Sequence, residues 1–203
     1  MIRLLERWAL DGPLVLTVMV LSLFGIAMIY SAGVVYVPNP VTESAWIRQG
    51  VWFILALAAF TALARVPVRW IEWVAVPAYV ISLVLLAATL IVGTGAGTAS
   101  GVRSWINLGF IRFQPAEIAK LATILVLARI LAQRDEPPTS IRDILLPASL
   151  VGLPLVLVLL QPDLGTTLAF IGILFAMLYW AGTPVTLLLL LASRCGDDLL
   201  LQL

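Results

Sequence analysis

The sequence predicts an all-α protein that crosses a membrane several times, and two observations carry that prediction. Of its 203 residues, 62% are hydrophobic and only 11% are charged, which is more apolar surface than a soluble domain of this size can cover. The apolar residues also gather in runs of roughly 17–25, the length that crosses the hydrocarbon core of a bilayer as a helix. We therefore expect a polytopic helical membrane protein, in which small residues such as Gly25, Gly152 and Gly172 let helices pack closely.

Six runs are long enough to be complete transmembrane helices, and a seventh begins but is too short. The seventh starts near Pro184 and reaches only Ala192 before Ser-Arg-Cys-Gly-Asp-Asp interrupts it. Residues 1–192 are thus expected to form one incomplete membrane domain, and 193–203 an atypical tail that indicates a truncation or a shifted reading frame. The six complete spans are expected at Pro13–Ala32, Trp46–Ala64, Glu72–Val92, Phe113–Ala132, Ile144–Leu160 and Leu164–Ala181.

The first run is predicted to be a membrane span and not a cleaved signal peptide. Its roughly twenty apolar residues exceed the 7–15 that are usual for a signal peptide, and five more spans follow. The distribution of Lys and Arg then predicts the orientation. With a cytoplasmic N-terminus, seven arginines fall on the inside and three on the outside, which favours that orientation. The seven are Arg3, Arg7, Arg65, Arg69, Arg129, Arg134 and Arg142, and the three are Arg48, Arg103 and Arg112.

Composition excludes several classes of site. With one cysteine, Cys195, the chain cannot form an internal disulfide, and without histidine it cannot build an imidazole-ligated metal site. No metal site is therefore expected from its side chains alone. The net charge is only +1 and no basic patch is present, so we expect no nucleic-acid partner.

A charged pair in the fourth run is the first candidate for function. Glu117 and Lys120 lie one helical turn apart at the head of an otherwise apolar segment. A charge at bilayer depth costs about 2.5–3.5 kcal/mol on insertion scales, so such residues usually face the protein interior and act there. One interpretation is a structural ion pair of Lys120 with Glu117 or Asp163. The other is a polar cavity, open to the outer leaflet and ringed by all three residues.

Two helix starts on the outer face share a pattern of amide, proline and acid. Proline suits the first turn of a helix and an acid there complements the helix dipole, so one interpretation is that both acids only begin helices. Prolines in the short fifth and sixth runs instead favour irregular backbone that lines a cavity. The two corners are Gln114-Pro115-Ala116-Glu117 and Gln161-Pro162-Asp163-Leu164-Gly165.

The loop before the fourth run offers further candidates. After a glycine-rich stretch at 93–101, Trp105 and Ile106 are typical of an interfacial re-entrant element, because tryptophan favours the headgroup level. Arg103 and Arg112 are expected to face the headgroups, where a guanidinium suits forked contacts with phosphate. Simple anchoring to lipid is the alternative. The glycine-rich stretch lacks the pattern of a phosphate-binding loop.

Three motifs, found together and in order, resemble the SEDS (shape, elongation, division, sporulation) family over about the first 190 residues. Their Gly-Phe-Ile-Arg-Phe-Gln segment is more similar to the rod-shape branch than to the division branch. Ala116 departs from the serine usual in the family. Members of the family have about ten spans, more than this sequence provides. Their expected general base, an aspartate, lies in an outer loop beyond this sequence. The motifs are Gly101-Val-Arg-Ser-Trp-Ile-Asn-Leu-Gly109, Arg112-Phe-Gln-Pro-Ala-Glu-Ile-Ala-Lys120 and Gln161-Pro-Asp-Leu-Gly-Thr166.

The resemblance implies a peptidoglycan glycosyltransferase of the bacterial cytoplasmic (inner) membrane. Such an enzyme polymerises lipid II, a disaccharide-pentapeptide on undecaprenyl pyrophosphate, together with a class B penicillin-binding protein and a divalent cation, Mg²⁺ or Mn²⁺. The catalytic candidates are Glu117, Lys120 and Asp163, with the acids tuning a proton, holding a cation or positioning the lysine. Cations would neutralise the departing pyrophosphate. The substrate-binding candidates are Arg103, Trp105, Arg112, Gln114 and Gln161.

Two rival functions share these features. A flippase that moves lipid II across the bilayer would also need intramembrane charges, broken helices and an outer-leaflet cavity. A non-catalytic assembly module would use the spans alone to dock a penicillin-binding protein, and it is the alternative for a chain without the later catalytic loop.

Overall fold

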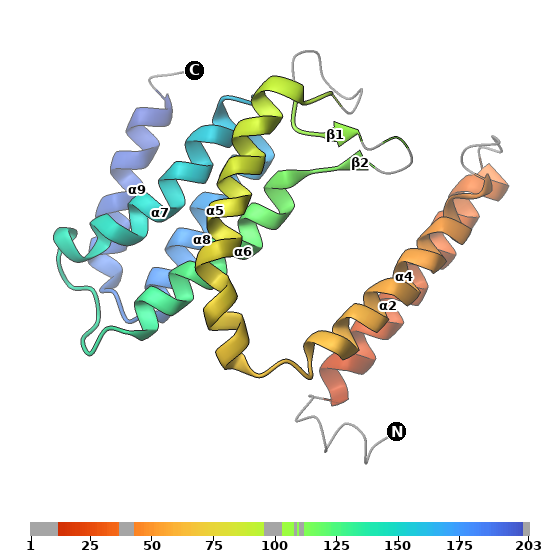
Figure 1. Cartoon of the computed structure of the whole chain (residues 1–203), viewed down its shortest axis with the longest axis horizontal. Coiled ribbons are helices and arrows are strands. Elements are labelled where there is room, and N and C mark those ends of the chain that lie inside the picture. Colours follow the sequence, from red (N-terminus) through yellow and green to blue (C-terminus); the bar gives the residue numbers. More distant parts are fainter. Residues whose placement is uncertain (1–11, 37–42, 96–102, 108, 110–111, 201–203) are drawn as a thin grey trace. The chain divides into compact units, whose positions relative to one another are not determined.

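The computed structural model describes residues 12–36, 43–95, 103–107, 109 and 112–200. They belong to two compact units, Met1–Pro67 and Val68–Leu203. Helices dominate both units (Figure 1), which confirms the prediction of a polytopic, essentially all-helical membrane protein.

The first unit is a pair of helices that lie side by side. Helix α2 (Gly12–Tyr30) continues into a π-helical turn, η1 (Ser31–Tyr36), and α4 (Ala45–Leu63) returns along it. Neither α-helix buries a residue, as expected of helices that are apolar on every side and face lipid. Where the two meet, the rings of Tyr30 and Trp46 stand edge to face with centroids 5.6 Å apart.

The second unit is a bundle of five helices joined by short connections, apart from the longer loop between the first two (Figure 1). Three of its helices start with chemistry that suits a helix N-terminus. Pro115 occupies the first turn of the second helix, Ser140 and Asp143 form a capping box at the third, and Asp163 caps the fourth. The helices are α5 (Val68–Val92), α6 (Pro115–Ala132), α7 (Ile141–Leu159), α8 (Leu164–Trp180) and α9 (Val185–Leu200).

The core of this bundle forms around α6. Its alanines at 116, 119 and 122 are buried at intervals of three residues, so the backbones of neighbouring helices can approach closely. The phenol of Tyr79 on α5 donates a hydrogen bond to the carbonyl of Leu150 on α7 at 2.7 Å, which ties those two helices directly. The fully buried large side chains that complete the main cluster are Leu86, Leu127, Val151, Val158 and Phe170.

The prediction of close helix contacts at three glycines is wrong. A Cβ atom built on Gly25, Gly152 or Gly172 meets no neighbouring atom within 4 Å. The alanines of α6 are the small residues that pack in the core instead, in clusters shared with α5, α7 and α8.

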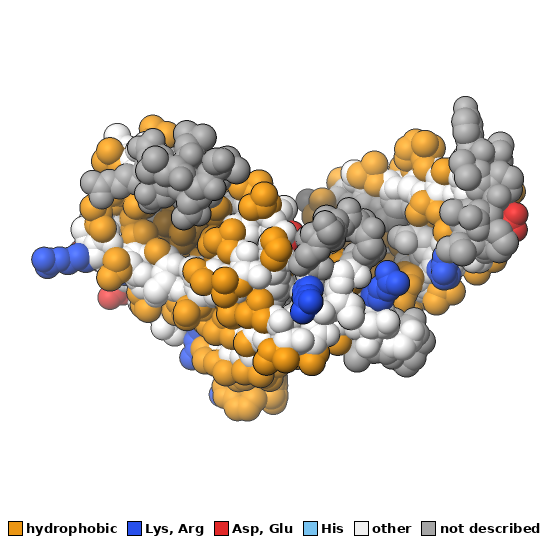
Figure 2. All heavy atoms as spheres, turned by 90° about the horizontal axis from the view of Figure 1, so that it is seen from above, with side chains coloured by type: hydrophobic (Ala, Val, Ile, Leu, Met, Phe, Trp, Pro, Cys, Tyr) orange, Lys and Arg blue, Asp and Glu red, His pale blue; other side chains and the backbone are white. Residues whose placement is uncertain are grey.

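Within the described ranges, four helical segments are long and apolar enough to cross a membrane: Gly12–Val34, Ala45–Leu63, Val68–Val92 and Ile141–Leu159. Helix α6 carries three charged residues, Glu117, Lys120 and Arg129, and α8 has only 17 residues. The predicted total of six complete spans thus stays a prediction, although a helix lies at each expected position. Hydrophobic side chains form large exposed areas on the face shown in Figure 2, as expected of helices that face lipid.

The seventh helix is longer than the sequence pattern suggested. We expected it to end at Ala192, but α9 runs from Val185 to Leu200. Polar residues end an apolar run without ending a helix, because Ser, Arg, Cys and Asp all tolerate helical backbone and only Gly196 disfavours it by about 1 kcal/mol.

The loop between α5 and α6 holds the only strands among the described residues. Strand β1 (Ile106–Asn107) pairs antiparallel with β2 (Arg112–Phe113), with Ile106 opposite Phe113 and Asn107 opposite Arg112. A bridge between Thr94 and Trp105 extends the pairing toward the end of α5. The segment that we expected to be re-entrant contains a short β-ribbon that projects to the side of the bundle, next to the end of α5 and the start of α6 (Figure 1).

Candidate functional site

Four segments meet at one end of the second unit: three that follow one another along the chain, and one that is distant from them in the sequence. They are the end of α5, the β-ribbon, the start of α6 and the corner between α7 and α8. The amide of Gln114 donates to the Asp163 carboxylate at 3.2 Å, which joins the two corners. The amide of Gln161 donates to the carbonyl of Leu86 at 3.1 Å, which joins the second corner to α5. The matching corners of the sequence are thus neighbours in space.

Asp163 is the hub of this junction. It is the N-cap of α8: one carboxylate oxygen accepts from the backbone N–H of Thr166 at 3.0 Å. The other accepts from the Thr166 hydroxyl at 2.8 Å and from Gln114. The Asp163 carbonyl accepts from the hydroxyl of Thr167 at 2.9 Å. Helix capping by Asp163 is therefore real, and the same carboxylate also positions the start of α6.

Glu117 and Lys120 form an ion pair with 2.9 Å between the ammonium nitrogen and a carboxylate oxygen. The lysine side chain is 23% exposed and the glutamate side chain 59% exposed. Of the two partners that we considered for Lys120, the structure selects Glu117 and not Asp163. The pair is on the i,i+3 face of α6, where the glutamate holds the ammonium group in place.

Gln161 is a buried anchor in this structure. Its residue is 1% exposed, and its side-chain carbonyl oxygen has no hydrogen-bond partner among the described residues. The amide nitrogen of the same side chain fixes the corner to α5, and the oxygen beside it is left as a free acceptor. The predicted role of Gln161 in binding substrate stays a prediction, and its observed contact is structural.

The arginines and the tryptophan of the loop lie on the β-ribbon. Arg103 and Arg112 are exposed, and Trp105 is half-buried. The backbone N–H and C=O of Trp105 both bond to Thr94, at 3.2 and 2.7 Å, so the ribbon is fixed to the end of α5. The two guanidinium groups thus stand on a short pinned element beside the junction, where they can meet an anionic group.

Sequence reasoning missed Gly93 and Thr166. A Cβ at Gly93 would overlap the carbonyl oxygens of Thr89 and Arg103, so a glycine is needed for the ribbon to approach α5. Thr166 gives Asp163 two of its hydrogen bonds. A signal for Thr166 was available, because an acid three residues before a threonine has N-cap spacing. Gly93 had none, since its role depends on a distant carbonyl.

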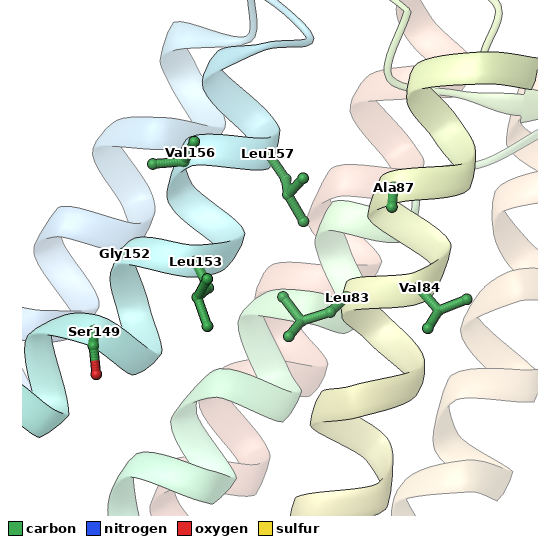
Figure 3. Close-up of a pocket in the computed structure, with 8 residues that line it drawn as sticks. All are labelled: Leu83, Val84, Ala87, Ser149, Gly152, Leu153, Val156 and Leu157. Carbon is green, nitrogen blue, oxygen red and sulfur yellow. The ribbon is translucent and has the colours of Figure 1, made fainter.

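A cavity of about 620 Å³ lies between α5 and α7, below the junction (Figure 3). Leu83 from α5 and Leu153 and Leu157 from α7 point into it, and its lining is almost wholly apolar. None of Glu117, Lys120 and Asp163 lines it. The polar cavity ringed by those three residues stays a prediction.

The described side chains are a poor set of ligands for a divalent cation. No three of the acidic or thiol groups in the described ranges gather as a metal site would require. Both oxygens of the Asp163 carboxylate already accept hydrogen bonds from protein donors, whereas Mg²⁺ needs near-octahedral oxygen ligation. We therefore derive no step through a cation.

The fold and this junction define a polytopic α-helical membrane protein whose amide, acidic and basic side chains gather at one end of a helix bundle. The chain belongs to the FtsW/RodA/SpoVE family of cell cycle proteins, whose family model matches residues 13–201. This confirms the resemblance to the SEDS family.

Several curated relatives are named probable peptidoglycan glycosyltransferase FtsW. The one from Mycobacterium tuberculosis is 33% identical over 175 residues, covering 83% of this chain and 33% of the relative. The one from Allochromatium vinosum is 32% identical over 202 residues, covering 97% of this chain and 50% of the relative. The chain thus spans between a third and a half of the length of these relatives.

Solved structures of the same fold also support membership of this family. The rod-shape-determining protein RodA of Thermus thermophilus matches with a TM-score of 0.73 and 36% identity, covering 86% of this chain and 54% of that one. A chain of a peptidoglycan synthase complex, solved to explain the coordination of polymerization and crosslinking, matches with a TM-score of 0.78 and 34% identity. This match covers 94% of this chain and 53% of the chain from the complex.

Proposed function

We propose that this chain forms the first half of a peptidoglycan glycosyltransferase and carries the part of its site that binds the pyrophosphate of lipid II. The observation that carries the proposal is the junction of the two corners through Gln114 and Asp163. It places Lys120, Arg103 and Arg112 at one end of the bundle, on the elements that begin or precede α6. The names of the curated relatives support the assignment of peptidoglycan glycosyl transfer as the reaction.

The chemistry follows from what polymerisation demands. One lipid II loses the bond between its anomeric carbon and the pyrophosphate oxygen, and the hydroxyl of a second sugar forms the new glycosidic bond. The leaving group is undecaprenyl pyrophosphate, which departs with negative charge. Basic side chains fixed near that charge lower the barrier, because they stabilise the transition state more than the ground state.

Each described residue has a distinct part in this proposal. Lys120 and the two arginines neutralise the pyrophosphate. Glu117 is a positioning residue, because its carboxylate holds the Lys120 ammonium at 2.9 Å. Asp163 is a second positioning residue that fixes Gln114 and the start of α8. The proton of the attacking hydroxyl requires a base, which we assign to the part of the relatives beyond this chain.

The setting is proposed on the same basis. We place the chain in the bacterial cytoplasmic membrane with its N-terminus in the cytoplasm, so that the junction faces outward. A class B penicillin-binding protein is the proposed partner, supported by the likeness to a chain of a peptidoglycan synthase complex. Cell elongation and rod-shape maintenance are the proposed process, supported by the Gly109–Gln114 segment and by the likeness to RodA.

The test is Glu117→Ala in a polypeptide that extends this chain to the length of its relatives. We expect glycan synthesis from lipid II in detergent to fall at least tenfold, because the ammonium group loses the carboxylate that anchors it. A tenfold fall corresponds to about 1.4 kcal/mol of transition-state stabilisation. Glu136→Ala, at an exposed residue beyond the far end of α6, is the matched control and should be fully active.

Other outcomes would select the rival functions. Glycan chains made from lipid II in detergent contradict a pure flippase, because no bilayer is present to cross. Lys120→Ala is also expected to lose activity, provided that its expression and membrane insertion match the wild type. If the chain is a non-catalytic assembly module, both substitutions should leave cell shape normal and co-purification of the penicillin-binding protein intact.

A further inference from the structure

A second binding site is suggested by a cavity at the other end of α5. The first turns of this helix carry Arg69, Trp70 and Trp73, which line a cavity of about 450 Å³. Both tryptophans are largely exposed, at 61% and 71%. Their rings meet edge to face with centroids 6.5 Å apart. Residues three and four apart share a helix face, so the guanidinium and the second indole lie over one surface.

The position of this cavity is that of a membrane boundary. Helix α5 has 25 residues, and at 1.5 Å per residue it is about 37 Å long, enough to cross a hydrocarbon core of about 30 Å. Its far end meets the β-ribbon of the candidate site (Figure 1). The cavity therefore lies at the opposite boundary, the level at which tryptophan is enriched.

The charged side chain that lines the cavity favours an anion. The Arg69 side chain forms no ion pair with another residue in the part of the chain that the structure describes. Glu72, one turn further, is exposed, and its backbone carbonyl accepts a hydrogen bond from the Arg129 guanidinium at 3.0 Å. Arg129 is thus fixed against the first turns of α5. The connection from α6 to α7 lies at the same end, and there Arg134 pairs with Asp143. Among the described residues, Arg69 is the charged residue that lines the cavity itself.

We propose that the cavity binds the headgroup of an anionic phospholipid. Arg69 makes the forked contact that a guanidinium forms with phosphate, and the indoles of Trp70 and Trp73 pack against the glycerol and the first acyl carbons. A phosphatidylcholine headgroup fits less well, because its quaternary ammonium offsets the phosphate charge that would meet Arg69. This site is separate from the proposed glycosyltransferase junction and does not depend on it.

The test uses the 203-residue chain in phosphatidylcholine nanodiscs that contain a small fraction of brominated lipid, either phosphatidylglycerol or phosphatidylcholine. Bromine near the headgroup quenches tryptophan emission on contact. We expect brominated phosphatidylglycerol to quench more than brominated phosphatidylcholine. Arg69→Gln should reduce this excess about fivefold, the contribution of one basic side chain at an anionic surface.

Two variants make the result specific. Trp70→Phe/Trp73→Phe should remove the excess quenching, which identifies the reporting rings among the seven tryptophans of the chain. Arg142→Gln, at an exposed arginine in the first turn of α7 with no tryptophan beside it in the sequence, should leave it unchanged. Equal quenching by the two lipids overturns the proposal. An Arg69→Gln chain that keeps wild-type helix content and shows an undiminished excess also overturns it. Relief of the excess by soluble glycerol phosphate would show a phosphate site that does not require a lipid.

Discussion

At the scale of single residues, the candidate site depends on one carboxylate that does two structural tasks. Asp163 caps α8 through Thr166 and holds Gln114 at the start of α6. Gln114 in turn makes no side-chain cap for its own helix, so its amide is free to cross to the neighbouring corner. A change at Asp163 should therefore loosen two helix starts at once.

We expect Asp163→Ala to lower the free energy of unfolding by about 1–2 kcal/mol, the usual cost of losing an N-cap. Asp163→Asn should cost less than half of that, because asparagine is an equally good cap and its amide can pair with Gln114. The measurement is unfolding of the detergent-solubilised chain by SDS, followed by circular dichroism. An alanine variant as stable as the wild type would show that the junction contributes nothing.

At the scale of elements, the β-ribbon is placed by its contact with the end of α5. Thr94 and Trp105 exchange backbone hydrogen bonds, and Gly93 leaves room for the carbonyl oxygen of Arg103. This packing determines where Arg103 and Arg112 stand relative to α6. A glycine in a loop thus controls the position of two charges that are distant from it in the sequence.

Gly93→Ala should displace the ribbon, because the added methyl group overlaps two backbone oxygens that cannot move aside as a side chain would. We expect a loss of about 1–3 kcal/mol in the free energy of unfolding, typical of overpacking. Gly152→Ala is the matched control: it lies within α7 with open space around it, and it should be neutral or stabilise by up to about 1 kcal/mol. Equal effects from both substitutions would contradict a close approach at Gly93.

At the scale of the whole molecule, α5 connects two surfaces of different character. One end meets the junction of amide, acidic and basic groups, and the other carries Arg69 and two tryptophans. A helix of 25 residues places these ends on opposite sides of a bilayer. The excess of arginine on the Arg69 side predicts that this side is cytoplasmic.

Cysteine accessibility tests that orientation. In a Cys195→Ser chain, cysteines introduced one at a time at Arg103 and Arg112 should react with a membrane-impermeant maleimide in intact spheroplasts. Cysteines at Arg69 and Arg142 should react only after the membrane is opened. The reverse pattern would place the junction in the cytoplasm and would end the proposal that it meets lipid II on the outer face.

The sequence by itself determined the class of the protein and the approximate place of its helices. Apolar runs of bilayer length predict spans because burial in lipid depends on composition and length alone. The corner motifs were also readable, since proline and an acid at a helix start act within one turn. Sequence was less reliable at the ends of elements, where α9 continued past the polar residues that follow Ala192.

The tertiary structure decided which residues meet. Gln114 and Asp163 are 49 residues apart, and no local rule pairs an amide with a particular distant acid. The same limit explains why Lys120 was left with two possible partners, why Gly93 gave no signal, and why the close-packing role expected of three glycines fell to the alanines of α6. Such contacts depend on how the helices pack against one another, which is a property of the folded bundle and not of any one segment.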